Sequence, residues 1–146
     1  MSFLAFRVAV FLLALSFATA STVNFVNQCG NGIDVIRTEN GAAPVVQCHL
    51  ERGQRCSGSF GSNGMNFKQG WQGRTLAEFT FNGGYNNDYW DLSVVDGFDV
   101  GMVLEGNGIT LVCRDRGCPD AYQHPGDNSK THGGPSGVTY TLTFCG

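Results

Sequence analysis

Residues 75–94, with the sequence TLAEFTFNGGYNNDYWDLSV, decide the fold class of this chain. Apolar and polar residues alternate in Thr75–Phe81 and again in Tyr89–Val94, as they do in strands that bury one face. Between the two runs, Asn82–Asp88 is rich in glycine and asparagine, which are typical of a loop that reverses the chain. The stretch therefore predicts a β-hairpin with one apolar and one polar face.

The polar face of this hairpin carries a candidate functional site. We expect the two strands to pair antiparallel, with Phe79 opposite Trp90. Glu78 then lies opposite Asp91 on the other face. The Cβ atoms of directly opposed residues are about 4.5–5.5 Å apart, and like charges at that distance destabilise a sheet. With Asp96 in the turn that follows, these residues form a carboxylate cluster, which is a candidate binding or catalytic site.

A structural interpretation of the same carboxylates stays open. Acidic residues on an exposed sheet face can serve solubility alone, and structural ion networks also perturb carboxyl groups. A register shift of one residue would separate Glu78 from Asp91.

The rest of the chain predicts further short strands and no capped helix. The expected strands are Thr22–Val26, Ile33–Arg37, Val45–Leu50, Met65–Lys68, Phe98–Glu105, Ile109–Cys113 and Val138–Phe144. Glycine-rich Ser57–Gly64 is expected to be a connection, and Pro125–Gly137 an exposed loop. Many short strands at regular spacing predict an all-β sandwich or barrel.

The N-terminus predicts secretion. Residues 1–20, MSFLAFRVAVFLLALSFATA, contain one arginine, an apolar run and an Ala18-Thr19-Ala20 cleavage site, the pattern of a signal peptide. The apolar run is shorter than the roughly 20 residues that span a bilayer, so we expect no membrane anchor. Cleavage after Ala20 would leave residues 21–146 as one domain of 126 residues.

Charge and cysteine content restrict the kinds of partner and ligand that we expect for this protein. Without residues 1–20, eight basic and twelve acidic residues remain, with no basic run, which argues against nucleic acid as a partner. Six cysteines in a secreted chain predict three disulfides, with 15 pairings open. The three histidines form no ligand cluster and no phosphate-binding glycine loop occurs, so we expect neither metal nor cofactor. No sequence feature specifies an oligomeric state.

Several motifs, in order, resemble the thaumatin-like proteins, the family of osmotin and the plant pathogenesis-related thaumatin-like proteins. The central block of that family resembles the hairpin together with Val95-Asp-Gly-Phe98 and Val100-Gly-Met102. Its first strand resembles Val23–Cys29, and its C-terminal block resembles Cys118-Pro-Asp-Ala-Tyr122 and Tyr140–Cys145. The resemblance implies a disulfide-stapled thaumatin-like β-sandwich.

The resemblance also implies a disulfide pattern and a short form of the family. By this resemblance, Cys29 pairs with Cys145 and Cys113 pairs with Cys118. Cys48 and Cys56 then remain as the third pair. Larger members insert a cysteine-rich second domain where this chain has only residues 114–117. We therefore identify the chain as a small thaumatin-like protein without that domain.

By resemblance, four of the five residues that line the family's acidic cleft map onto positions here. Glu78, Asp91 and Asp96 match its glutamate and two of its aspartates, and Asp127 resembles the third aspartate. The family's arginine has no clear match, and Lys68 is the nearest basic residue on the expected strand. A lysine keeps the charge but lacks the planar fork that grips a carboxylate.

The resemblance implies a secreted protein that binds β-1,3-glucan, in an antifungal, defence or cell-wall role. The first alternative is a weak endo-β-1,3-glucanase, with Glu78 as general acid and Asp91 as its charged partner. The second is an extracellular protein-interaction or inhibitor domain, because a fold does not fix a function.

Overall fold

A computed structural model describes residues 19–146 of the protein, so the predicted signal peptide lies almost entirely outside the described residues. Twelve strands make up its regular structure. They are β1 (Ser21–Asn27), β2 (Ile33–Glu39), β3 (Val45–Leu50), β4 (Arg55–Phe60), β5 (Asn63–Gln69), β6 (Leu76–Phe81), β7 (Asn87–Ser93), β8 (Met102–Gly106), β9 (Ile109–Cys113), β10 (Ala121–Tyr122), β11 (His132–Pro135) and β12 (Thr139–Phe144). Within residues 19–146, no helix is long and apolar enough to cross a membrane.

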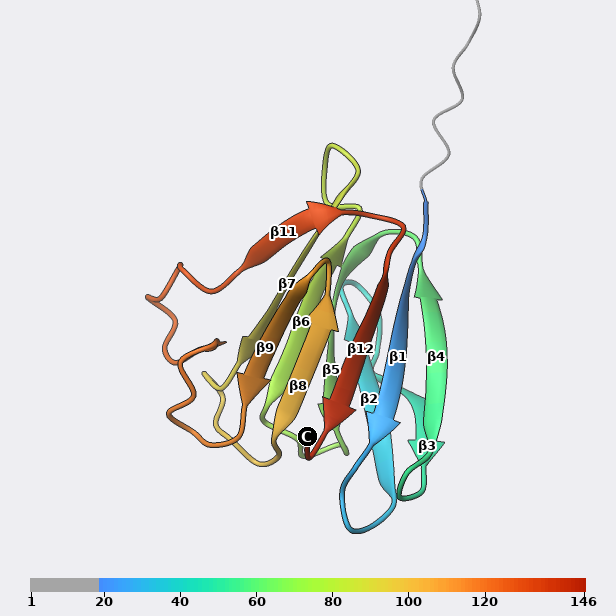
Figure 1. Ribbon diagram of the computed structural model, residues 1–146, viewed down its shortest axis with the longest axis vertical. Helices are drawn as coiled ribbons and strands as arrows, with labels where there is room; N and C mark the ends of the chain where they lie inside the picture. The colour runs from blue at the N-terminus through green and yellow to red at the C-terminus, as the bar shows by residue number, and fades with distance from the viewer. Residues whose placement is uncertain (1–18) are drawn as a thin grey trace, which may run out of the picture.

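The strands form two sheets that lie face to face, which confirms the predicted β-sandwich (Figure 1). The five-stranded sheet has the order β4-β1-β12-β8-β9. The seven-stranded sheet has the order β10-β7-β6-β5-β2-β3, with β11 also paired to β7. In Figure 1, β11, which pairs with β7, lies at the top of the view and continues into β12. The chain therefore passes from the seven-stranded sheet to the five-stranded sheet at this point.

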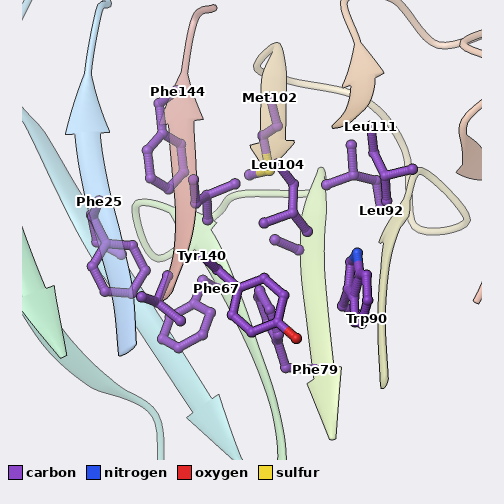
Figure 2. Close-up of a cluster of buried hydrophobic side chains, with 14 of the residues drawn as sticks. Phe25, Phe67, Phe79, Trp90, Leu92, Met102, Leu104, Leu111, Tyr140 and Phe144 are labelled. Carbon is purple, nitrogen blue, oxygen red and sulfur yellow. The ribbon is translucent and has the colours of Figure 1, made fainter. Parts of the chain in front are cut away.

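The inward faces of the two sheets share one core of aromatic and aliphatic side chains (Figure 2). Tyr140 of β12 is fully buried, and its ring centroid lies 5.2 Å from those of both Phe79 and Trp90. Phe25 of β1 reaches Phe67 of β5 at 4.8 Å. Side chains from both sheets therefore interlock, and aromatic pairs at these distances add stability beyond their buried area.

Three disulfides hold the edges and ends of the sandwich together. They are Cys29–Cys145, Cys48–Cys56 and Cys113–Cys118, the pairing that the family resemblance implies. The first disulfide links the residues that follow β1 and β12, two parallel neighbouring strands. The second joins β3 and β4, which are edge strands of opposite sheets. The third closes a short turn at residues 114–117.

Three expected segments differ from the structure. Ser57–Gly64 is not a loop, because its first half belongs to β4, an edge strand of which only Phe60 is buried and which therefore shows no apolar alternation. Pro125–Gly137 contains β11, an edge strand, where a proline is tolerated. The strand expected from Phe98 begins only at Met102, because Asp99 instead accepts the backbone N–H groups of residues 74 and 75.

Candidate functional site

A polar groove of about 330 Å³ lies on the outer face of the seven-stranded sheet, away from the aromatic core. Strands β2, β5, β6 and β7 form its floor, and the segment before β11 contributes one wall. The lining residues are Thr38, Asn40, Gly64, Met65, Asn66, Glu78, Phe79, Thr80, Tyr89, Asp91 and Thr131. Its volume is at the lower end of the range of small-ligand sites.

The β6–β7 hairpin brings the two central carboxyl groups together. Glu78 pairs directly with Asp91, and Phe79 with Trp90, so the predicted register is confirmed. Phe79 and Trp90 point into the core, which forces the two carboxyl side chains onto the outer face. Burial of the aromatic residues thus fixes the position of the acidic pair.

Asp91 is buried although it lies on the outer face, with 8% of its surface exposed. Its Oδ2 accepts a hydrogen bond of 3.1 Å from the hydroxyl of Thr131. Tyr122 of β10 anchors Thr131 in turn, because its hydroxyl accepts the Thr131 backbone N–H at 3.0 Å. The other oxygen, Oδ1, is buried and has no hydrogen-bond partner among the described residues.

The electrostatics of the pair follow from this burial. Burial, together with the charge of Glu78, raises the pKa of Asp91 to about 7. The pKa of Glu78 is also raised, by burial first and then by the charge of Asp96. Within residues 19–146, no ion pair involves any of these three carboxyl groups. Two opposed carboxyl groups without a neighbouring cation each disfavour the ionisation of the other.

The structure brings some of the predicted site residues together and leaves others outside the groove. Glu78 and Asp91 line it, and Asp96 lies close enough for its charge to act on Glu78. Lys68 shares the outer face, but its Nζ donates to the backbone carbonyl of Trp71 and does not line the groove. Asp127 is in the exposed loop before β11.

The loop that carries Asp127 contributes a different residue to the site. The Asp127 side chain accepts hydrogen bonds from the hydroxyl and the backbone N–H of Ser129, and the Ser129 hydroxyl is the main cause of its lowered pKa. It is Thr131 that reaches Asp91. The sequence holds no signal for that contact, because a lone threonine in a polar loop is unremarkable.

Neutral polar side chains extend the groove from the acidic pair. Asn66 pairs with Glu78 across β5 and β6, and Thr38 pairs with Asn66 across β2 and β5, so all three lie in one row. Their outward direction follows from alternation with buried Phe67 and Phe79. The row offers amide, hydroxyl and carboxyl groups, which can donate to and accept from the hydroxyls of a polyol.

The same residues offer little to a metal ion or a cofactor. No group of three or more His, Cys, Asp or Glu side chains in residues 19–146 is arranged to hold a metal ion. The lining residues include no cation that could hold a phosphate.

Comparisons with curated proteins find similar plant proteins. A barley protein (Hordeum vulgare), Pathogenesis-related protein 1C, is 34% identical, and the match covers 93% of this chain and 96% of the barley protein. A rice protein (Oryza sativa subsp. japonica), Thaumatin-like protein, is 49% identical over 72 residues, which cover 49% of this chain and 40% of the rice protein. The oat protein (Avena sativa) Thaumatin-like pathogenesis-related protein 3 is 45% identical, with 43% of its length covered. The match thus spans less than half of the rice and oat relatives.

Solved structures with a similar fold include the protein elicitor MoHrip2 from Magnaporthe oryzae and the thaumatin-like xylanase inhibitor TLXI. The first has a TM-score of 0.69 at 23% identity and covers 87% of this chain and all of its own. The second has a TM-score of 0.64 at 16% identity, covering 85% of this chain and 99% of its own. At such identities the likeness shows a shared fold. No protein-family model matches the chain.

Proposed function

This chain belongs to the thaumatin-like protein family, and from that premise we propose that its polar groove binds neutral β-1,3-glucan as part of an extracellular defence role. The pathogenesis-related names of its relatives support a role in defence. Its three disulfides favour an oxidising, extracellular compartment. Glucan as the ligand comes from the family resemblance and from the chemistry of the groove.

The observation that carries the proposal is the acidic pair at the centre of a row of neutral polar groups. Glucan hydroxyls donate and accept hydrogen bonds, and the carboxyl, amide and hydroxyl groups of the groove do the same. Tyr89 lines the groove with 37% of its surface exposed, so its ring is available to a sugar face. Without a cation in the lining, the groove favours an uncharged ligand over an acidic one.

The open position of the acidic pair on the sheet face favours binding over hydrolysis. Glycosidases keep their two carboxyls about 5–5.5 Å apart to retain, or about 6.5–9.5 Å apart to invert, the anomeric configuration. Glu78 and Asp91 are directly opposed across β6 and β7, which places their Cβ atoms about 4.5–5.5 Å apart. The groove above them is an open sheet face from which water is not excluded, and such a site gives little electrostatic preorganisation for hydrolysis.

Pelleting with insoluble β-1,3-glucan at pH 5 tests the proposal. We expect the parent protein to pellet with the polysaccharide and Glu78→Ala to lose most of this binding, because the substitution removes a carboxyl from the floor of the groove. The control is Glu105→Ala, on β8 of the other sheet, which should bind like the parent. Equal binding by all three proteins would contradict the assignment of the site.

The same samples separate the alternatives. Reducing sugar that the parent releases and Glu78→Ala does not would establish a weak endo-β-1,3-glucanase. A parent protein that neither binds nor cleaves the glucan would favour a protein-interaction or inhibitor role.

A further inference from the structure

We propose that Glu78 and Asp91 hold one proton between them, that Thr131 positions this pair, and that the groove binds its glucan only while the proton is in place. The inference rests on the proposed function for the identity of the ligand. The proton itself is argued from the geometry of the free protein.

The first observation is a buried oxygen without a partner. Asp91 is more than nine-tenths buried and lines the groove, yet its Oδ1 has no hydrogen-bond partner among the described residues. An unsatisfied buried oxygen is costly, and a bare buried charge costs more. The group beside Asp91 is the carboxyl of Glu78, which can hydrogen-bond to it only if one of the two is protonated.

The second observation is the set of groups that face the pair from neighbouring elements of residues 19–146. From β6 and the turn after β7 come further negative charges, Glu78 itself and Asp96. From β5, Lys68 turns its ammonium group toward a loop carbonyl. From β10, Tyr122 directs its hydroxyl to Thr131. No cation among these groups compensates the pair, so a proton is the available positive charge.

The remaining titratable groups nearby point elsewhere. Arg74, before β6, packs its side chain against Gly97 in the turn after β7, and it forms no ion pair with Glu78, Asp91 or Asp96 within the described residues. His132 of β11 stacks on Trp90 on the inward face of β7. Lys130 and His124 lie in the exposed loop, where their charges act on Asp127. These positions agree with the raised pKa of about 7 for Asp91, which burial and Glu78 cause.

Thr131 makes the two carboxyls unequal. Its hydroxyl donates to Oδ2 of Asp91, whereas Oδ1 has no hydrogen-bond partner among the described residues. A donor to one carboxylate oxygen stabilises the charged form of that group. Thr131 is therefore a positioning residue, because it determines how readily the pair gives up its proton.

Loss of the proton should weaken glucan binding. Two negative charges in contact repel each other, and with no cation in the groove the side chains must separate or admit water. Either change disturbs the floor on which the sugar lies. A neutral glucan has no titratable group of its own near neutral pH, so a pH dependence of binding would originate in the protein.

A carboxyl ¹³C NMR titration of the full-length secreted protein, without ligand, tests the proton. We expect the pair to titrate in two separated steps, the upper one near pH 7. Thr131→Val should raise the upper midpoint by about 0.5–1 pH unit, because it removes the donor to the Asp91 carboxylate. Thr131→Ser should restore it, and Ser129→Ala, in the same loop but bonded to Asp127, should leave it unchanged.

A single step below pH 5, or an unchanged midpoint in Thr131→Val, would overturn the inference. Asp91→Asn gives an independent check, because its amide imitates the protonated acid and should remove the upper step.

Glucan pelleting at pH 5 and pH 8.5 tests the consequence for binding. We expect the parent protein to lose at least fivefold in affinity at pH 8.5, whereas Asp91→Asn binds equally at both values. His49→Gln controls for His49, another side chain with a raised pKa, and should keep the dependence of the parent. A parent protein that binds equally at both pH values overturns this inference. One that binds no glucan even at pH 5 overturns the proposed function, while the titration still decides the shared proton.

Discussion

Asp88 and Asp91 lie three residues apart on β7, and both are buried, but their side chains have opposite directions and different hydrogen-bonding environments. Asp88 points inward and is fully enclosed, whereas Asp91 points outward into the groove. The residue type, the strand and the degree of burial are shared. What differs is the number of donors that each carboxyl receives.

Asp88 is saturated with hydrogen bonds. Its Oδ1 accepts from the backbone N–H of Asn82 and the hydroxyl of Ser136, and its Oδ2 accepts from the hydroxyls of Ser21 and Tyr140. These donors come from β1, the loop of the β6–β7 hairpin, and the segment that runs from the β11–β12 connection into β12. The carboxylate therefore joins three parts of the chain at one end of the sandwich.

Asp91 accepts one hydrogen bond, from the hydroxyl of Thr131, and lies beside the carboxyl group of Glu78. A carboxyl placed this way does not strengthen the sheet, and its burial costs stability. The comparison indicates that a saturated buried carboxylate is structural and that an under-satisfied one at a groove is a candidate for function. Each of the following substitutions tests one side of this contrast.

The largest effect should come from Asp88→Ala. The change leaves four donors without their acceptor in a closed site, and we expect it to lower the free energy of unfolding by about 3–5 kcal/mol. Urea denaturation at pH 7 measures this loss, with Glu105→Ala, on an exposed strand position, as the control. A loss below 1 kcal/mol would show that the hydrogen bonds to Asp88 contribute little.

Sequence reasoning could find the strand that carries both residues but could not separate their roles. The alternation in Tyr89–Val94 follows from burial on one face, so the hairpin register and the pairing of Glu78 with Asp91 were predictable. The donors to Asp88 were not, because Ser21, Ser136 and Tyr140 are 67, 48 and 52 residues away along the chain. Only the return of β12 beside β1 brings them together.

The same limit applies at the groove. Thr131 reaches Asp91 over 40 residues, from a segment whose only strand reads His-Gly-Gly-Pro. Such a strand pairs through its backbone with β7 and needs no apolar pattern, so neither its existence nor its register can be inferred from composition. The acidic pair is local in sequence and was predictable, whereas the hydroxyl that positions it is not.

Asp91→Asn should have the opposite sign to Asp88→Ala. Because the pKa of Asp91 is raised to about 7 in the folded protein, the folded state binds a proton more tightly than the unfolded chain does. The parent protein therefore loses stability as pH rises from about 4 to about 7. The amide has no proton to lose, so the variant should match the parent at pH 4 and exceed it by about 1–3 kcal/mol at pH 8.

Thermal unfolding at the two pH values measures this difference. Glu105→Gln, which removes an exposed negative charge from β8, should show no such dependence on pH. An Asp91→Asn protein that is less stable than the parent at pH 8 would make Asp91 a structural carboxylate like Asp88.

The smallest effect should separate two serine–aspartate hydrogen bonds of almost equal length. The hydroxyl of Ser136 donates to buried Asp88 at 2.7 Å, and that of exposed Ser129 donates to Asp127 at 2.8 Å. Ser136→Ala removes one of four donors to a fully buried carboxylate, and we expect it to cost about 0.5–1.5 kcal/mol. In Ser129→Ala, water replaces the lost hydroxyl, so we expect no measurable change in the free energy of unfolding. Urea denaturation of both variants at pH 7 decides the point. Equal costs would mean that hydrogen-bond length, and not the enclosure of the carboxylate, determines what each contact contributes, and the contrast between Asp88 and Asp91 would then lose its physical basis.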